Sequence, residues 1–120
     1  MRDPRIDKLA RTLVRFSTQV RDGDNVLIQA TDADRELVKA LIEEVYRAGG
    51  KPFVWLRDAQ IERALLLGCT AEQLELRARA DAMLMERMQV YIGFTGILNR
   101  AEHSDVPAEK QNLFSTRYTH

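Results

Sequence analysis

The sequence predicts a three-layer α/β domain of the Rossmann-like or flavodoxin-like class, with a short parallel sheet of strand order 2-1-3. Short apolar runs alternate with amphipathic segments, these runs are apolar throughout, and the turns between them are short. Continuous apolar runs indicate strands that are buried on both faces, and short connections favour right-handed parallel crossovers. Because three strands leave exposed sheet edges, we expect the domain to be incomplete at its C-terminus.

The first segment, residues 3–20, is predicted to be a helix. Asp3 can cap its N-terminus, and Pro4 suits the first helical position. Apolar residues at intervals of three or four form one stripe, which comprises Ile6, Leu9, Leu13, Phe16 and Val20. Basic residues lie largely off this stripe, namely Arg5, Lys8, Arg11 and Arg15. We interpret these basic residues as a solvated helix surface in preference to a phosphate site.

A turn at residues 22–24 precedes the first strand, Val26-Leu27-Ile28. Asp32 or Asp34 then caps a second helix, whose apolar face comprises Leu37, Val38, Leu41, Ile42 and Val45. The sequence Ala-Gly-Gly at residues 48–50 ends this helix in the manner of a glycine C-cap.

The second strand is predicted at residues 52–56 and the third at residues 90–94. Between them lie two helices. The first runs from Asp58 to about Gly68, with Ile61, Ala64 and Leu65 as its inner face, and the second runs from a capping box at Thr70 and Gln73 to about Met88. Residues 104–120 resemble the start of another helix, because Pro107 suits the first helical position and Glu109 lies in the first turn. We therefore expect residues 1–120 to be the N-terminal α/β domain of a larger enzyme, whose catalytic domain is absent from this chain.

The composition is that of an ordinary globular domain without a charged partner. The chain has 18 Lys and Arg residues and 18 Asp and Glu residues, which gives a formal net charge of zero. This balance gives no electrostatic argument for nucleic acid or a membrane surface as partner. The apolar runs are far shorter than the roughly 20 residues of a membrane span, and the N-terminus does not resemble a signal peptide. Cys69 is the only cysteine, so we expect no internal disulfide and a cytoplasmic protein.

Most familiar sites are not predicted. The turn after the first strand, residues 29–35, has no glycine and carries two carboxylates, so a dinucleotide site is improbable. There is no P-loop, and no aspartate follows the third strand as a phosphoacceptor would require. His103 is interpreted as a surface-loop histidine, Cys69 as a small buried residue, and the methionines Met83, Met85 and Met88 as core filler. We expect no catalytic and no metal-binding residue in this chain.

One loop keeps a possible role in binding. Residues 95–100 follow the third strand, and ligand crevices in parallel sheets form outside the carboxyl ends of the strands. Asn99 and Arg100 could therefore line a cleft formed with another domain, although an ordinary polar loop is the stronger interpretation of the residues alone.

Several motifs in order resemble one family of peptidases. They are Asp-Pro-Arg-Ile-Asp-Lys-Leu-Ala at 3–10, Gly-Asp-x-Val-Leu-Ile within 20–29, Arg-Ala-Gly-Gly-Lys-Pro at 47–52, the segment 64–75, Tyr-Ile-Gly at 91–93 and Ser-Asp-Val-Pro-Ala-Glu-Lys at 104–110. The chain resembles the N-terminal domain of the aminopeptidase T/aminopeptidase S metallopeptidases, often called leucyl aminopeptidases. No single motif is specific, whereas their order and spacing together are.

The resemblance implies a cytoplasmic, homodimeric hydrolase that removes N-terminal residues from peptide substrates with two divalent metal ions, such as zinc or cobalt. The family's metal ligands lie in the later catalytic domain, so no catalytic or metal residue is carried over to this chain. The resemblance implies that the parent protein is the enzyme and that this domain alone is inactive, serving as scaffold, cleft wall or dimer contact. The alternatives are a free-standing α/β module that binds a small ligand, and an oligomerisation module without chemistry.

Overall fold

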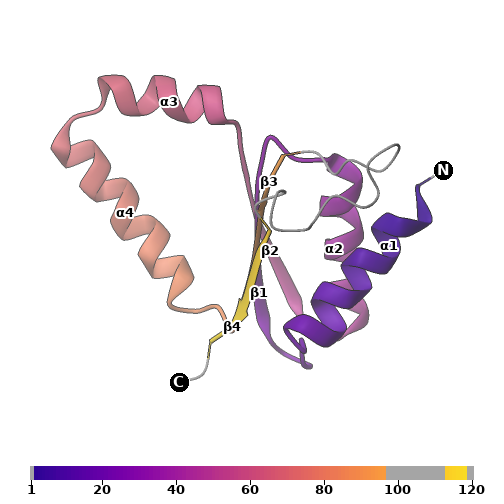
Figure 1. Ribbon diagram of the computed structural model, residues 1–120. Helices are drawn as coiled ribbons and strands as arrows, with labels where there is room; N and C mark the ends of the chain where they lie inside the picture. Colours follow the sequence, from indigo (N-terminus) through magenta and orange to yellow (C-terminus); the bar gives the residue numbers. More distant parts are fainter. Residues whose placement is uncertain (1, 97–112, 119–120) are drawn as a thin grey trace.

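The computed structural model describes residues 2–96 and 113–118 of the chain, and it is an α/β fold built on one mixed sheet (Figure 1). The sheet order is β2-β1-β3-β4. β1 (Asn25–Thr31) pairs in parallel with β2 (Lys51–Arg57) and with β3 (Val90–Thr95), while β4 (Phe114–Arg117) runs antiparallel to β3. The predicted fold class is confirmed, and the predicted order 2-1-3 is extended by one strand. The predicted helix is wrong for the described C-terminal residues, because Phe114–Arg117 form a strand instead.

The N-terminal helix forms as predicted but changes its winding. α1 (Pro4–Arg11) begins at Asp3, whose side chain accepts a hydrogen bond from the backbone N–H of Arg5, and it continues into a π-helix, η1 (Thr12–Ser17). The backbone N–H of Thr18 and its hydroxyl both donate to the carbonyl of Leu13, at 3.1 and 2.8 Å.

The wider turn of η1 changes which side chains face the sheet. Val14 is fully buried, whereas Phe16 is 71% exposed. The prediction that Phe16 belongs to the apolar stripe is therefore wrong, because that stripe assumes 3.6 residues per turn and a π-helical turn holds more.

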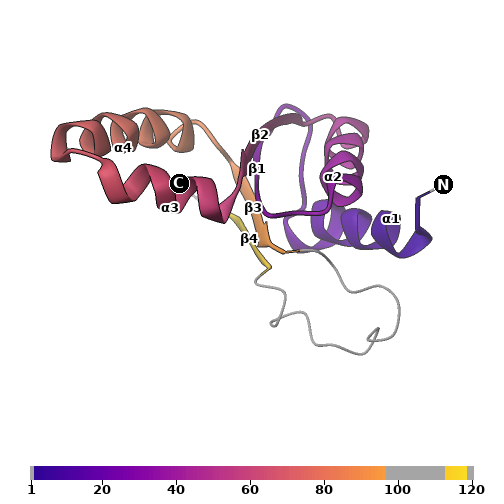
Figure 2. The ribbon, with the colours of Figure 1, turned by 90° about the horizontal axis from the view of Figure 1, so that it is seen from above.

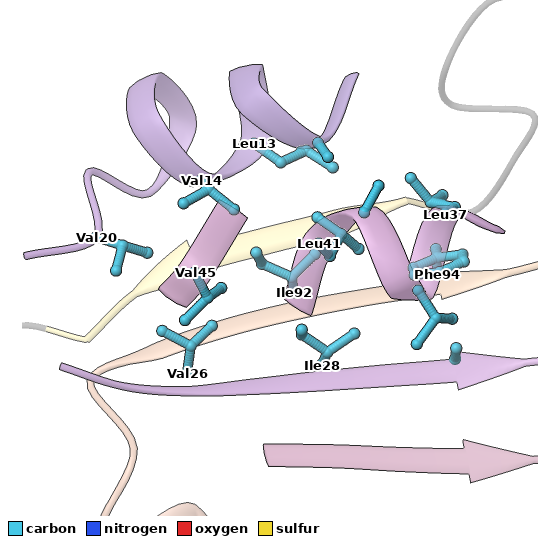
Figure 3. Close-up of a cluster of buried hydrophobic side chains, with 14 of the residues drawn as sticks. Leu13, Val14, Val20, Val26, Ile28, Leu37, Leu41, Val45, Ile92 and Phe94 are labelled. Carbon is cyan, nitrogen blue, oxygen red and sulfur yellow. The ribbon is translucent and has the colours of Figure 1, made fainter. Parts of the chain in front are cut away.

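The core lies between the sheet and the layer formed by α1, η1 and α2 (Arg35–Arg47) (Figure 3). Its members come from all of these elements and include Ile6, Val14, Val26, Ile28, Leu37, Leu41, Val45, Ile92 and Phe94. Gly49, at φ 86°, ends α2, and the N–H of Gly50 donates to the carbonyl of Val45 at 2.9 Å, which confirms the predicted glycine cap. The central strand β1 fits the prediction of burial on both faces, since Val26, Leu27 and Ile28 are all fully buried.

The edge strand β2 does not follow that prediction. No residue of β2 is fully buried, and Phe53 is 37% exposed. An apolar run does not distinguish a central strand from an edge strand whose second face is uncovered.

α3 (Ala59–Gly68) and α4 (Ala71–Met85) lie on the other side of the sheet and project away from it as a hairpin (Figures 1 and 2). The Thr70 cap is as predicted, because Thr70 accepts a hydrogen bond from the N–H of Gln73, and α3 starts at the predicted place, where Asp58 is its cap. Neither helix has a buried residue. The predicted inner face of α3 is therefore wrong for this structure, because Ile61 is 66% and Leu65 41% exposed.

A salt bridge joins β4 to the loop before β1. The Arg117 guanidinium donates to both oxygens of the Asp24 carboxylate, at 2.7 and 3.3 Å, and the backbone N–H of Arg21 donates to the same carboxylate at 2.7 Å. Asp24 is only 7% exposed. A buried carboxylate needs such partners, so this pair fixes the fourth strand to the start of the sheet.

Candidate functional site

The carboxyl ends of the three parallel strands meet at one edge of the sheet, called here the carboxyl edge. Thr31 at the end of β1 lies in register with Arg57 at the end of β2 and with Thr95 at the end of β3. In open parallel sheets, ligands bind outside this edge. Both the sequence and the topology therefore indicate the carboxyl edge as the candidate position of a ligand site.

Asp32 lies in the turn that follows β1, and hydrogen bonds join it to the end of β2 and the start of α3. Its backbone has φ 51°, a left-handed conformation that aspartate tolerates better than most residues. Its N–H donates to the carbonyl of Arg57 at 3.0 Å, and its Oδ1 accepts from the N–H of Ala59 at 3.1 Å. Asp32 therefore fixes the geometry of the carboxyl edge, which is a structural role.

The neighbouring aspartates cap helices. Asp34 accepts from the N–H of Glu36 at 3.0 Å, so it is the cap of α2 that the sequence left open between Asp32 and Asp34. Asp58 accepts from the N–H groups of Gln60 and Ile61, at 2.9 and 3.0 Å. The carboxylates at this edge are thus engaged by backbone donors at helix starts, where negative charge is favoured.

Four charged residues connect the end of β2 to the helical hairpin. The Glu62 carboxylate accepts hydrogen bonds from Arg57, at 3.1 Å, and from Arg77. Arg57 also lies 3.6 Å from Asp81 and packs over the ring of Trp55, 4.9 Å from its centroid. These contacts are the most extensive described link between α3, α4 and the sheet.

The electrostatics of this cluster argue against proton transfer. The hydrogen bond from Arg77 lowers the pKa of Glu62, and the charges of Arg77 and Arg57 add to this against partial desolvation. A carboxylate with a lowered pKa that two guanidinium groups hold is a weak proton acceptor at neutral pH. Glu62 is therefore a structural anchor in this arrangement.

Two hollows flank α3 near the carboxyl edge. The larger, of about 620 Å³, is lined by Thr31, Ala59, Glu62, Arg63, Leu66 and Leu67. The smaller, of about 320 Å³, is lined by Leu56, Arg57, Asp58, Ile61 and Glu62. Both volumes fall in the range of small-ligand sites, and the larger hollow is mostly apolar. Such a surface suits the packing of apolar side chains better than the recognition of an ionic ligand.

The residues singled out from the sequence do not form a site in the described part of the chain. Asn99, Arg100 and His103 lie outside the described residues, so their predicted roles stay predictions. Cys69 is half-buried at the junction of α3 and α4. Only one of the three methionines matches the core interpretation: Met88 is 1% exposed, whereas Met83 is 61% exposed.

Sequence reasoning missed the ion cluster around Glu62. Part of the signal was present, because Arg77 and Asp81 are four residues apart on a helix and such pairs are neighbours. The contact from Arg77 to Glu62 crosses from one helix to another, and the contact from Arg57 begins on a strand. No local spacing predicts these two contacts.

Comparison with known protein families places the chain. Residues 2–119 match the family described as thermophilic metalloprotease (M29). The chain belongs to this metalloprotease family. The match confirms the resemblance to the N-terminal domain of the aminopeptidase T/S metallopeptidases, and it gives the parent protein the class of metallopeptidase, a hydrolase. No curated protein matches the chain significantly.

Membership in an M29 metalloprotease family raises the question of where a metal would bind. Among residues 2–96 and 113–118 there is no group of three or more His, Cys, Asp or Glu side chains that could hold a metal ion. The carboxylates at the carboxyl edge and beside it accept hydrogen bonds from backbone N–H groups or guanidinium groups; they are Asp32, Asp58 and Glu62. The described residues therefore do not fit a metal centre, and no catalytic step is assigned to them. Within the same residues, no helix is long and apolar enough to cross a membrane.

Proposed function

We propose that this chain is the N-terminal α/β domain of a metalloaminopeptidase, which releases N-terminal amino acids from peptides with two divalent metal ions such as zinc or cobalt. The single observation that carries this proposal is the family match over residues 2–119. In this proposal, the metal ions are bound by a catalytic domain outside the 120 residues. They would activate a water molecule and polarise the scissile carbonyl.

The role proposed for the domain itself is that of a scaffold. Its carboxylates at the carboxyl edge hold backbone and guanidinium groups in place, and its helical hairpin presents a large apolar surface. Seven large apolar side chains of α3 and α4 are at least 41% exposed, namely Ile61, Leu65, Leu66, Leu67, Leu74, Leu76 and Met83. At about 1.5–3 kcal/mol for each fully buried side chain, covering this apolar hairpin surface would be worth on the order of 6–12 kcal/mol.

The proposed occupant of the apolar hairpin surface is the catalytic domain, with a second copy of the protein as the other candidate partner in a homodimer. Isolated helices of 10 and 15 residues are marginally stable in water, so packing against a partner surface would also stabilise α3 and α4. We place the protein in the cytoplasm on the basis of its single cysteine.

The first experiment measures leucine release from a leucyl amide by the purified 120-residue chain, with zinc and cobalt added separately. We expect no metal-dependent release above the buffer control, with an active family member as positive control. Metal-dependent turnover that is lost on chelation would show that the chain carries its own catalytic centre, which would refute the assignment of catalysis to another domain.

The second experiment tests the apolar hairpin surface in the complete protein. Leu67→Glu and Leu76→Glu place charges on side chains that are 76% and 71% exposed. We expect them to weaken domain or subunit association, measured by analytical ultracentrifugation and limited proteolysis. Phe16→Glu is the matched control, since Phe16 is equally exposed on the opposite helical layer. Equal behaviour of all three variants would contradict the proposed use of this surface.

A further inference from the structure

A charged hollow lies between α1 and α2, away from the carboxyl edge and from the apolar hairpin surface. The two helices lie side by side on one face of the sheet (Figures 1 and 2). The hollow has a volume of about 600 Å³ and is lined by Arg2, Asp7, Arg11, Arg15, Glu44 and Arg47. This volume lies within the range of small-ligand sites.

The charge of this arginine hollow stands out from that of the whole chain. Four guanidinium groups and two carboxylates line it, giving a formal charge of +2, and it remains positive when the neighbouring Glu43, which contacts Arg2, is included. The chain as a whole has a formal net charge of zero. A concave surface with an excess of one sign concentrates ligands of the opposite sign.

Glu44 forms the floor of the hollow and orients two of the arginines. Its side chain is 7% exposed, and it accepts hydrogen bonds from Arg15 Nε at 3.5 Å and from Arg47 Nη1 at 2.7 Å. A buried carboxylate requires such partners. Each guanidinium group has five N–H donors, so both arginines retain donors that these bonds do not use.

Two further arginines, Arg11 and Arg2, bring donors that have no partner among the described residues. Arg11 lies one helical turn from both Asp7 and Arg15, yet it makes no ion pair or hydrogen bond in the described structure. Arg2 is held by Glu43 at 2.5 Å and by Asp7 at 3.0 Å, while its Nε is buried and has no hydrogen-bond partner among the described residues. A buried donor without a partner among the described residues calls for an acceptor, which a water molecule or an anion would supply.

We propose that the arginine hollow binds a small, multiply charged oxyanion. Arg11, Arg15 and Arg47 would supply the guanidinium forks, which match the oxygens of phosphate and carboxylate groups, and Glu44 would keep two of them in position. The other account of this region is an ion-pair network at the surface, which binds nothing and adds little to stability. The two accounts differ in whether Arg11 has a function, since it makes no hydrogen bond or ion pair with the described residues.

The test is isothermal titration calorimetry of the 120-residue chain with pyrophosphate and, separately, with citrate, at an ionic strength held constant with sodium chloride. Pyrophosphate represents phosphate ligands and citrate represents carboxylate ligands. We expect saturable binding of at least one of them. Arg11→Ala should weaken that binding about tenfold or more, because a hydrogen bond to a charged group contributes about one power of ten or more.

Lys8→Ala is the matched control, since it removes the same charge from the same helix at a residue that does not line the hollow. Its affinity should stay within about twofold of the original, which excludes a general electrostatic effect. Circular dichroism checks that both variants are folded. Binding of neither anion at millimolar concentration, or an equal loss in both variants, would overturn the proposal.

Discussion

Replacing Arg117 with alanine tests how the fourth strand is held, because Arg117 is the partner of a buried carboxylate. The change removes both guanidinium hydrogen bonds to Asp24, at 2.7 and 3.3 Å, and leaves only the backbone N–H of Arg21 at 2.7 Å among the bonds to that carboxylate. Removing one partner of a fully buried pair costs about 3–5 kcal/mol. Since the Arg117 side chain keeps 20% of its exposure, we expect a loss of about 2 kcal/mol in the free energy of unfolding.

The pH dependence of this loss distinguishes the ion pair from simple packing. Burial alone would raise the pKa of Asp24, but the hydrogen bonds from Arg117 and Arg21, together with their charges, outweigh it and lower this pKa. A lowered pKa in the folded state means that Asp24 stabilises the fold above the ordinary aspartate pKa of about 3.9. That contribution is lost as the pH falls through the folded value. In Arg117→Ala the Asp24 carboxylate is buried without its guanidinium partner, so its pKa rises. Protonation of Asp24 at low pH then removes the unpaired charge and reduces the destabilisation of the variant.

The assay is urea unfolding at pH 7 and at pH 3.5, followed by the fluorescence of Trp55, the only tryptophan. We expect the difference in unfolding free energy between the original protein and Arg117→Ala to be largest at pH 7 and clearly smaller at pH 3.5. At pH 7 the melting temperature should fall by about 8 °C. Arg79→Ala is the control, because Arg79 forms an exposed pair with Glu75 and should change the melting temperature by less than about 2 °C. An equal difference at both pH values would refute the argument.

Two further predictions concern packing. Val14→Ala should lower the free energy of unfolding by about 2 kcal/mol, because it leaves a cavity in the core, whereas Phe16→Ala should change it little. Thermal unfolding of both variants measures this ranking. A regular helix in place of the π-helix η1 would give the reverse ranking. Gly93→Ala should lower the free energy of unfolding by about 1–2 kcal/mol, because an added Cβ would lie 2.5 Å from the Tyr91 hydroxyl. The same change should displace Tyr91 from its 3.0 Å hydrogen bond to Gln29. An unchanged Tyr91 resonance in NMR would contradict this.

The sequence predicted the parts of the fold that depend on local chemistry. The aspartate and threonine caps, the glycine end of α2 and the central strands all follow from side chains within a few residues of each other. The phase of the N-terminal helix could not be predicted in the same way. The π-helical turn at η1 coincides with a backbone bond from Thr18 to Leu13, and the choice between Val14 and Phe16 as the buried residue depends on packing against the sheet.

The fourth strand escaped prediction for a different reason. Its antiparallel pairing with β3 joins residues that are far apart in the sequence. Its main side-chain contact, between Arg117 and Asp24, joins residues 93 positions apart. A short polar segment such as Phe-Ser-Thr-Arg has no alternation that marks it as a strand. A proline and a glutamate upstream of it gave a local signal for a helix, which the long-range pairing of Phe114–Arg117 overrides.

The candidate site shows the same division. Sequence and topology both direct attention to the carboxyl edge, yet the carboxylates found there serve as caps and anchors, and the residues predicted to line a cleft, Asn99 and Arg100, lie outside the described part. The arginine hollow arises because α1 and η1 lie beside α2, so that Arg11 and Arg15 line the same hollow as Arg47 and the buried Glu44. On α1 alone, the basic residues have the spacing of a solvated surface. Only the second helix supplies the buried carboxylate that turns part of this surface into an oriented set of donors, and this is why the effect of Arg11→Ala on anion affinity separates the two interpretations.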